Sequence, residues 1–451
     1  MRIAPNLPAS AAAAVPRYTS YPTAPHLRAE SAGAAREQLL AAARIAPTVS
    51  VYVHIPYCDR LCWFCGCHTR HTLKYEPVEA YVGALESEIR VWSRLLTIRP
   101  NLSALHLGGG SPSLLREPEL ERLSGCLREA FEFLPEAEIS VELDPSDGCE
   151  AIVPALASLG MNRASIGVQD FSAEVQAAIN RPQTFEQTAR LVEALRAHGV
   201  RSLNIDALYG LPKQNFERLE HTVEQVLSLA PDRIALFGYA HVPWMKKHQR
   251  LIAESDLPSG EERLAQAIGA SNKIAAAGYA RIGIDHFARP GDSLAIASAE
   301  GRLRRNFQGY TTDNAEVLIG LGASAIGQTR SAIVQNEIAT GQYRATIETG
   351  SPATARGFVL DREDQIRAWI IERLMCDLAF RFDSLCAAYG ELAAPCESLA
   401  RRVAAEIGAG ICTVDDGVFR ISEEARPFVR VVASRFDAYL ENSQARYSRA
   451  V

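Results

Sequence analysis

Three cysteines, Cys58, Cys62 and Cys65, stand in a C-x3-C-x2-C arrangement within the segment YCDRLCWFCGC. Thiolates at such short spacings are typical ligands of iron–sulfur clusters, and a [4Fe–4S] cluster held by three thiolates keeps one iron open to a small molecule. The triplet directly follows residues 51–55, an alternating apolar run that predicts a β-strand. The sequence therefore predicts a cluster on a loop at the carboxyl end of a strand, where α/β folds place their chemistry.

A zinc site is the main alternative to a cluster, because Cys67 brings a fourth thiol into the same short segment. Structural zinc sites usually combine two separated cysteine pairs, and the sequence offers no second pair. The remaining cysteines are scattered singly, at Cys126, Cys149, Cys376, Cys386, Cys396 and Cys412. Disulfide bonds are not expected in a long chain without a convincing export signal, so this usage indicates a reducing, cytoplasmic compartment.

The composition bounds the class of protein and its partners. The chain has 451 residues, of which 47% are hydrophobic, and a formal net charge of −6. Proteins that bind nucleic acids show a basic patch or stripe, so no nucleic-acid partner is expected. No apolar run reaches the roughly 18 residues that a membrane span needs. An alanine-rich stretch at residues 9–14 resembles part of an export signal, but Pro5 and Pro8 interrupt the segment before it, and we expect no signal peptide.

Strand-like and helix-like patterns alternate between residues 46 and 290, which indicates βα units around a parallel sheet. Apolar side chains recur at helical spacing in residues 75–97, 185–198 and 215–229. This pattern predicts an α/β fold built as a partial or complete barrel. Its six strands are expected at residues 51–55, 104–107, 138–143, 163–168, 202–208 and 233–239.

The pattern changes near the C-terminus, where helices are expected at residues 363–380 and 396–408. Residues 411–421 predict a hairpin, and Ser422 is expected to cap a final helix. Such a winged-helix-like module often binds nucleic acid, but the negative net charge of the chain favours a role in packing or in covering the active site. The expected divisions are an N-terminal arm at 1–45, a barrel with an extension at 46–330, and a mostly helical domain at 331–451.

Small or polar residues recur at the ends of successive predicted strands. Because the carboxyl ends of barrel strands meet at one mouth, these residues are expected to share one site. Three glycines after the second strand allow backbone to approach a ligand closely. His286, further along the chain, is interpreted as a core histidine, with general base catalysis as the alternative. The strand-end residues are Gly108-Gly109-Gly110-Ser111, Glu142, Gln169, Asp170, Asn204, Asp206, Tyr239, Ala240 and His241.

Ten segments together resemble the family of oxygen-independent coproporphyrinogen III oxidases, which is part of the radical S-adenosylmethionine superfamily. The cysteine motif alone is typical of the whole superfamily, whereas PRYTSYPT, the fourth cysteine Cys67 and NFQGYTT are far more specific. The resemblance extends from about residue 16 to the end of the chain. Its segments are PRYTSYPT, YVHIPYC with LCWFCGC, GGGSP, VELDP, GVQDF, NIDALYGLP, YAHVP, IDHFARP, NFQGYTT and RYSRA.

This resemblance implies a partial six-stranded radical-SAM barrel and assigns residues to its cofactors. Cys58, Cys62 and Cys65 would bind one [4Fe–4S] cluster, whose fourth iron takes the amino and carboxylate groups of S-adenosylmethionine. The residues implied around that molecule are Tyr52, Phe64, Gly109, Glu142 and Ile326. The residues that match contacts to a second S-adenosylmethionine in the family are Gly110, Ser111 (where threonine is expected), Gln169, Arg181, Asp206 and Ala240.

The implied reaction is the oxidative decarboxylation of two propionates of coproporphyrinogen III, giving protoporphyrinogen IX for haem biosynthesis. A 5′-deoxyadenosyl radical takes a hydrogen from each propionate β-carbon, and loss of CO2 and an electron leaves a vinyl group. The expected partners are a reductase or a flavodoxin- or ferredoxin-type electron donor, and the protein is expected to be a monomer. Cations expected to bind the propionates are Arg17, Lys246, Lys247 and Arg289.

Three other functions remain open from the sequence. A haem chaperone with the same barrel would keep the three cysteines, but it usually lacks both Cys67 and the PRYTSYPT segment. A different radical enzyme acting on a tetrapyrrole is a second alternative. A DNA-binding sensor is a third, and the net charge of −6 opposes it.

Overall fold

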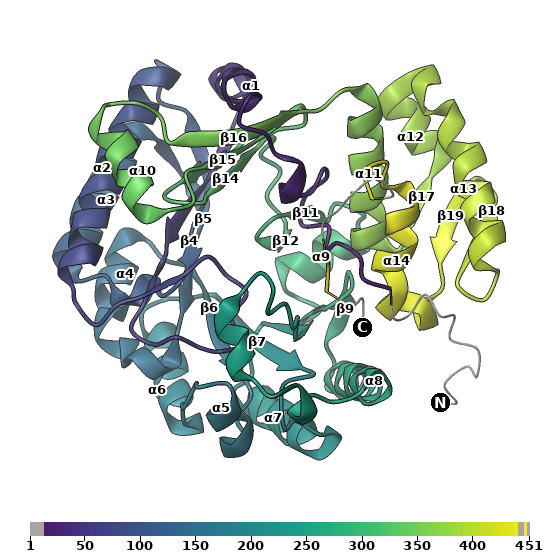
Figure 1. Ribbon diagram of the computed structural model, residues 1–451, viewed down its shortest axis with the longest axis horizontal. Helices are drawn as coiled ribbons and strands as arrows, with labels where there is room; N and C mark the ends of the chain where they lie inside the picture. Colours follow the sequence, from purple (N-terminus) through teal and green to yellow (C-terminus); the bar gives the residue numbers. More distant parts are fainter. Residues whose placement is uncertain (1–12, 441–445, 449–451) are drawn as a thin grey trace.

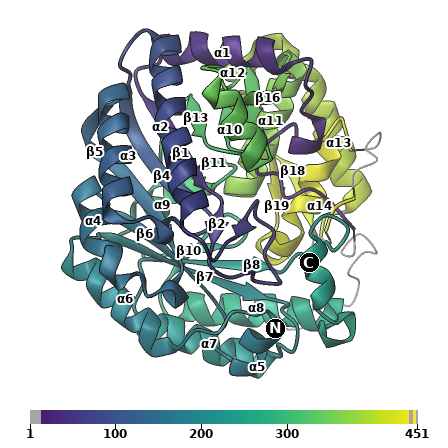
Figure 2. The same ribbon diagram turned by 60° about the vertical axis from the view of Figure 1, so that its left-hand side comes forward.

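Six parallel strands lie side by side where the sequence predicts them, in the order β1-β4-β5-β6-β7-β8 (Figures 1 and 2). Each is followed by a connection that contains helix, which keeps successive strands parallel. The strands are β1 (Val49–Ile55), β4 (Asn101–Gly109), β5 (Glu132–Leu143), β6 (Arg163–Gln169), β7 (Ser202–Tyr209) and β8 (Arg233–Gly238). The predicted barrel core is therefore confirmed.

The computed structural model describes residues 13–440 and 446–448. The first twelve residues of the expected arm, most of the alanine-rich stretch and the end of RYSRA lie outside the described residues. Within the described part of the chain, every helix is too short or too polar to cross a lipid bilayer.

Helices cover the outer face of the sheet (Figures 1 and 2). Two of them begin with a capping box, in which Thr184 and Gln187, or Ser259 and Glu262, exchange side-chain and backbone hydrogen bonds. The helices that follow the strands are α2 (Glu76–Leu96), α3 (Glu117–Ala130), α4 (Val153–Leu159), α5 (Ala173–Ala178), α6 (Phe185–Ala197), α7 (Phe216–Ser228) and α8 (Gly260–Ala276).

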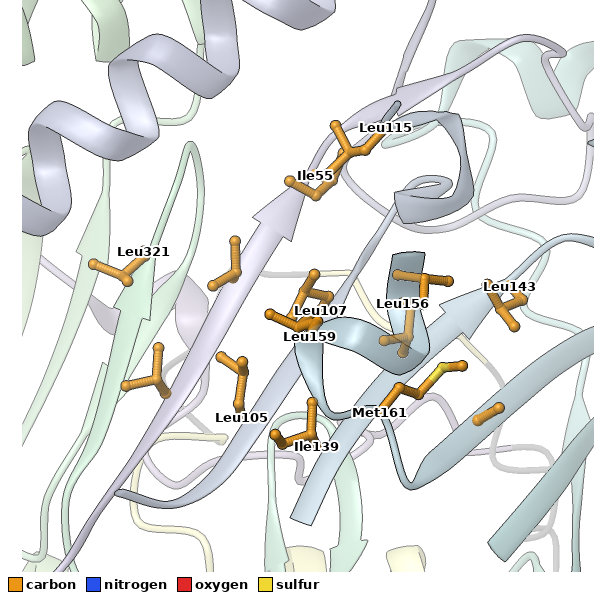
Figure 3. Packing of buried hydrophobic residues seen from close by; sticks show 14 of the residues in the cluster. Ile55, Leu105, Leu107, Leu115, Ile139, Leu143, Leu156, Leu159, Met161 and Leu321 are labelled. Atoms are coloured by element: carbon orange, nitrogen blue, oxygen red, sulfur yellow. The ribbon is translucent and has the colours of Figure 1, made fainter. Parts of the chain in front are cut away.

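The main core lies between this helical layer and the sheet. Leu156 and Leu159 of α4 belong to the same buried cluster as Leu105 and Leu107 of β4 and Ile139 of β5 (Figure 3). All five side chains are at most 5% exposed. Burial of each such side chain contributes about 1.5–3 kcal/mol, so this layer holds the strand ends in fixed positions.

Further strands extend the sheet at both edges, and the sequence patterns missed them. A seventh parallel strand, β13 (Leu318–Leu321), pairs with β1, and three antiparallel strands continue the sheet beyond it. The twelve-stranded sheet has two unjoined ends, so the barrel is open. The added strands are β14 (Ile326–Gln328), β15 (Ala332–Asn336) and β16 (Thr354–Val359) at one edge and β10 (His286–Ala288) and β9 (Ala280–Ile282) at the other.

Several shorter elements pack around this sheet. Helix α1 (Ala32–Ile45), which the sequence patterns missed, lies against β15 and β16, where Gly357 approaches Ala35. The sheet itself runs past residue 330, the expected end of the barrel and its extension. The remaining elements are β2 (Tyr57–Cys58), β3 (Arg70–His71), α9 (Ser293–Ala299), β11 (Arg304–Asn306), β12 (Gly309–Thr311) and α10 (Thr340–Glu348).

The C-terminal part has a hydrophobic cluster of its own, in which the rings of Phe380 and Phe419 stack at 5.4 Å. The predicted hairpin is confirmed, and a third strand, β17, pairs with it. The elements are α11 (Arg362–Asp377), β17 (Ala379–Arg381), α12 (Phe382–Tyr389), α13 (Ala394–Ile407), β18 (Cys412–Asp415), β19 (Val418–Ile421) and α14 (Val429–Ala433).

Ser422 stands at the N-cap position of the final helical segment, as predicted, but its side chain makes no capping hydrogen bond. Its hydroxyl donates to the carbonyl of Gly410 at 3.2 Å, and residues 423–428 form a 3-10 helix. Pro427 lies inside this segment, and proline has no N–H to donate to an α-helical ladder. The α-helix therefore begins only at α14.

The segment before α1 packs between the barrel and the C-terminal part of the chain (Figure 1). The hydroxyl of Tyr18 donates to Asp437 Oδ2 at 2.9 Å, and the backbone N–H of Ala438 donates to the hydroxyl of Tyr21 at 3.1 Å. Both tyrosines are buried in the C-terminal hydrophobic cluster. The PRYTSYPT segment is therefore a packed part of the fold rather than a free extension.

Candidate functional site

The cysteine loop leaves the carboxyl end of β1 and is held by the segment after β6. The backbone N–H of Trp63 donates to the carbonyl of Ile179 at 2.9 Å, and the side chain of Asn180 donates to the carbonyl of Leu61 at 2.9 Å. Arg60 reaches the carbonyl of Pro182 at 3.2 Å. These bonds place the loop over the strand ends, as the sequence predicts.

The loop is also held from a second direction, by the segment after β8. Lys246 donates to the carbonyl of Cys67 at 2.7 Å, and His248 to the carbonyl of Cys65 at 2.8 Å. The fully buried side chain of Gln249 donates to the carbonyl of Phe64 at 2.9 Å. Carbonyls of a loop need such partners when they leave water, so this segment is part of the cysteine site. The sequence analysis did not identify this role.

The three predicted ligand cysteines lie close enough to influence one another. Burial raises the pKa of the Cys58 thiol, and the neighbouring charges of Cys65 and Cys62 raise it further. Burial also raises the pKa of Cys62, while Arg181 opposes this effect. Metal binding deprotonates such thiols, because the metal's own charge outweighs the burial penalty.

The donor set fits an iron–sulfur cluster. In residues 13–440 and 446–448, no three His, Cys, Asp or Glu side chains converge closely enough to hold a single metal ion. A cluster does not need that convergence, since each thiolate binds a different iron. Arg181 adds a hydrogen bond from its Nη1 atom to the sulfur of Cys62 at 3.4 Å, which stabilises a thiolate.

The glycine turn after β4 is shaped by its neighbours. Gly109 has a φ of +111°, and a Cβ atom there would lie 2.5 Å from the ring of His54. Its backbone N–H donates to Glu142 Oε2 at 2.9 Å, and His106 is 3.0 Å from Glu142 Oε1. Burial opposes ionisation of Glu142, but the bonds from His106 and Gly109 hold its pKa below the usual value. A carboxylate in this position can accept hydrogen bonds from hydroxyl groups of a ligand.

A chain of aromatic side chains leads from β1 toward the cysteine loop. The hydroxyl of Tyr52 donates to Nδ1 of His54 at 2.8 Å, and Nε2 of His54 donates to the carbonyl of His68 at 2.9 Å. Burial lowers the pKa of His54 to about 4, so its ring is neutral at neutral pH. The ring of Tyr52 packs edge-on against Phe307 at 5.0 Å. This arrangement fixes the hydroxyl and the ring of Tyr52.

Polar side chains lie at the end of β6 and within β7. Gln169 has a φ of +69°, a conformation that is uncommon for a residue with a side chain. Asn204 donates to Asp206 Oδ1 at 2.7 Å, and burial with repulsion from Glu142 raises the pKa of Asp206 to about 6. The buried Oδ1 atom of Asn204 has no hydrogen-bond partner in the described part of the chain. Such a group indicates a place where a ligand or water donates a hydrogen bond.

A cavity of about 920 Å³ opens beside these residues. It borders Cys67 of the cysteine loop and four of the five residues predicted around S-adenosylmethionine, namely Tyr52, Gly109, Glu142 and Ile326. Small-molecule sites usually measure about 300–1,000 Å³, so the cavity is large. Its basic lining residues are Arg17, Lys246, Arg281, Arg305, Arg426 and Arg430.

The remaining predicted residues lie around the cavity rather than on its wall. Phe64 packs with Ile179 and Tyr239 in a small hydrophobic cluster. Gly110 and Ser111 donate backbone N–H groups to the carbonyls of Ile55 and Tyr57 at 2.7 and 2.8 Å. The other residues outside the cavity wall are Gln169, Arg181, Asp206 and Ala240.

Two of the four predicted propionate-binding cations lie away from this cavity. Arg289 follows β10, which runs antiparallel to β8, and it bonds the carbonyl of Pro231 at 3.0 Å, at the opposite end of β8. Lys247 is exposed and does not line the cavity. Arg17 and Lys246 do line it. Because β10 pairs antiparallel with β8 at the sheet edge, Arg289 lies at the end of β8 that is far from the cavity. No local sequence pattern indicates this pairing.

His286 lies on the cavity wall, 2.7 Å from Asp285 Oδ1, with its ring against Phe237 and Tyr310. Its hydrogen bond and ring contacts are those of a packed core histidine, and the residue also borders the cavity. Arg305 and Arg430 also reach the cavity, and the sequence analysis missed both. Arg305 directly precedes the polar-aromatic segment NFQGYTT, and this neighbouring motif could have identified it as a residue of the site.

Comparison with known proteins identifies close relatives. Residues 52–226 match the model of the radical SAM superfamily. The oxygen-independent coproporphyrinogen III oxidase of Bradyrhizobium diazoefficiens is 44% identical, with 97% of each chain covered. That of Paracoccus denitrificans is 46% identical over 95% of this chain and 94% of the relative. Among solved structures, the radical SAM enzyme coproporphyrinogen III oxidase (HemN) of Escherichia coli superposes with a TM-score of 0.89, at 38% identity, covering 94% of this chain and 97% of that one.

Proposed function

The chain belongs to the family of oxygen-independent coproporphyrinogen III oxidases, and from this premise we propose that it converts coproporphyrinogen III to protoporphyrinogen IX. The reaction is an oxidative decarboxylation of two propionate side chains to vinyl groups. It serves haem biosynthesis without oxygen, as an oxidoreductase of the radical SAM type.

The observation that carries this proposal is the large cavity with basic residues on its wall, next to the cysteine loop. The substrate carries four carboxylates, which need cationic partners when they leave water. Glu142, Tyr52 and Cys67 of the cysteine loop all line this cavity, so S-adenosylmethionine and the substrate would share one space beside the cluster loop. The site thus offers a binding volume next to the cysteines, which suits a radical reaction.

Cys58, Cys62 and Cys65 would hold the [4Fe–4S] cluster, and Tyr52, Phe64, Gly109, Glu142 and Ile326 would surround S-adenosylmethionine. Together these groups would supply the 5′-deoxyadenosyl radical that takes hydrogen from a propionate β-carbon. The chain's own residues bind and orient the substrate and exclude water and oxygen.

A second S-adenosylmethionine would contact Gly110, Ser111, Gln169, Arg181, Asp206 and Ala240. The partnerless Oδ1 atom of Asn204 supports a ligand in this region, because a donor from that ligand would satisfy it. We further propose a low-potential electron donor of the flavodoxin or ferredoxin type, acting on a monomer. All ten cysteines are free thiols, which suits the reducing cytoplasm.

Anaerobic turnover tests the proposal. The enzyme with a reconstituted cluster receives dithionite, S-adenosylmethionine, coproporphyrinogen III and a cell extract as acceptor source, and products are followed by mass spectrometry. Protoporphyrinogen IX is expected from the natural chain and not from Cys62→Ala. Cleavage of S-adenosylmethionine without decarboxylation, together with tight haem binding, would replace the oxidase with a haem chaperone.

A further inference from the structure

Three guanidinium groups from distant parts of the chain line one cavity. Arg17 lies on the N-terminal arm, Arg305 on β11 and Arg430 on α14. Arg305 Nη2 donates to the backbone carbonyl of Arg17 at 3.4 Å. The arm, the barrel extension and the C-terminal domain therefore each contribute one arginine to the same space.

These arginines lie close enough to repel one another. Burial lowers the pKa of Arg430 to about 10, and the charges of Arg17 and Arg305 lower it further. Partial loss of water also lowers the pKa of Arg17, with a contribution from Arg305. Arg17 keeps contact with solvent, and Arg305 and Arg430 are half-buried. Like charges gathered in such a space are unfavourable unless anions neutralise them.

The acidic groups around the cavity do not balance this charge. Asp285 is the carboxylate that acts on all three arginines, and it also bonds His286 at 2.7 Å. Glu142 is bonded by Gly109 and His106. Glu423 is paired with Arg426 at 2.6 Å. Glu424 is the fourth carboxylate on the wall, so four carboxylates face six basic side chains, and the excess of positive charge suits an anionic ligand.

Two of the guanidinium groups are held in place by bonds that use only some of their donors. Arg17 Nη2 donates to the carbonyl of Gly238 at 2.8 Å. Arg305 Nη1 donates to the hydroxyl of Tyr310 at 2.8 Å, and its buried Nε atom has no partner among the described residues. Pre-positioned guanidinium groups bind carboxylates with little further loss of entropy.

We propose that Arg17, Arg305 and Arg430 form an anion site that binds propionate carboxylate of the substrate. This inference rests on the proposed function and adds the residues that recognise the substrate. Guanidinium groups pair with carboxylates through two parallel hydrogen bonds, so this site orients the macrocycle as well as attracting it. Substrate binding then relieves the repulsion among the three arginines and holds the arm and the C-terminal domain against the barrel.

Direct binding of coproporphyrin III, the stable oxidised form of the same tetracarboxylate, tests the site. Its dissociation constant is measured by fluorescence titration on the enzyme with its cluster, for Arg17→Met, Arg305→Met and Arg430→Met. Each variant is expected to bind about tenfold to a hundredfold more weakly, as for loss of a charge-assisted hydrogen bond. The corresponding lysine variants are expected to recover part of the affinity.

Arg289→Met is the matched control, because it removes the same charge outside the cavity. Iron content and melting temperature identify a variant that fails to fold, in which case its lysine counterpart supplies the comparison. Affinities within twofold of the natural chain for all three sites, or an equal loss in Arg289→Met, would overturn the proposal.

Turnover separates this proposal from the proposed function. With coproporphyrinogen III, the three variants are expected to show a raised KM, while Arg289→Met, outside the cavity, is expected to keep the KM of the natural chain. If the natural chain binds coproporphyrin III but does not decarboxylate coproporphyrinogen III, the proposed function fails. The affinities of the variants still decide the arginine site in that case.

Discussion

Arg181 donates one hydrogen bond to the sulfur of Cys62, at 3.4 Å, and from the same Nη1 atom another to Asp144 Oδ2, at 2.7 Å. Its Nη2 atom also bonds the carbonyl of Gly167. The side chain is buried, so its charge acts on the sulfur with little screening by water. The carboxylate of Asp144 thus fixes a cation against a predicted cluster ligand.

Arg181→Met is expected to make the midpoint potential of the reconstituted cluster more negative. Hydrogen bonds and charge at ligand sulfurs stabilise the added electron. Loss of roughly 1 kcal/mol of this stabilisation corresponds to about 40 mV for a one-electron couple. A redox titration followed by electron paramagnetic resonance measures the change. Arg190→Met, on the exposed face of α6, should leave the potential unchanged, and equal potentials in both variants would refute the role of Arg181.

Gly109→Ala is expected to reduce the free energy of unfolding by about 1–3 kcal/mol. The backbone at Gly109 has a φ of +111°, and the added Cβ atom would meet the ring of His54. Urea unfolding measures the effect. Gly125→Ala is the control, since Gly125 lies exposed within α3 with open space around it, and there alanine should stabilise by about 1 kcal/mol. Two variants of equal stability would contradict the packing argument.

Gln249→Met is expected to loosen the cysteine loop. The carbonyls of Phe64 and Ala240 would lose their donor, at a cost of about 1–3 kcal/mol for each buried group left unsatisfied. Faster hydrogen–deuterium exchange in residues 61–68 and lower iron retention on anaerobic gel filtration would report this change. Arg250→Met alters the exposed neighbouring residue and should behave as the natural chain does. Unchanged exchange in Gln249→Met would show that the loop is held by its other contacts.

Glu88 is expected to make stability depend on pH. It is fully buried, and it accepts hydrogen bonds from Tyr343 and Asn336 at 2.7 Å and from the backbone of Gly322. Burial raises its pKa to about 7 from an ordinary 4.5. At pH values between 4.5 and 7, the folded protein therefore keeps a proton on Glu88 that the unfolded chain has released. Its stabilising effect is therefore complete below about pH 4.5 and is lost as the pH rises through 7.

Glu88→Gln should remove this part of the pH dependence. The natural chain is expected to lose roughly 3 kcal/mol between pH 5 and pH 8 relative to the variant. Urea unfolding of both proteins at the two pH values measures the difference, and other titrating groups cancel in the comparison. Parallel pH profiles for the two proteins would show that Glu88 has the same pKa in the folded and unfolded states.

Local patterns in the sequence were sufficient for the barrel core. Alternating and helical spacings of apolar side chains report which face of an element is buried, and β1 and β4–β8 formed where these patterns predicted them. The cysteine spacing likewise predicted a loop at the end of β1. Short strands such as β13 and β17 were missed, because three or four residues carry too little pattern to distinguish a strand from a loop.

The tertiary structure alone decided which charges share the cavity. Arg17, Arg305 and Arg430 are separated by more than a hundred residues each, and only the packing of the arm and the C-terminal domain brings them together. The same holds for Arg289, which antiparallel pairing of β10 with β8 carries to the far end of the sheet. The sequence by itself determined the six core strands, the helices between them and the type of chemistry, since these depend on nearby residues. The cavity's charge depends on contacts between distant segments, and these exist only in the folded chain.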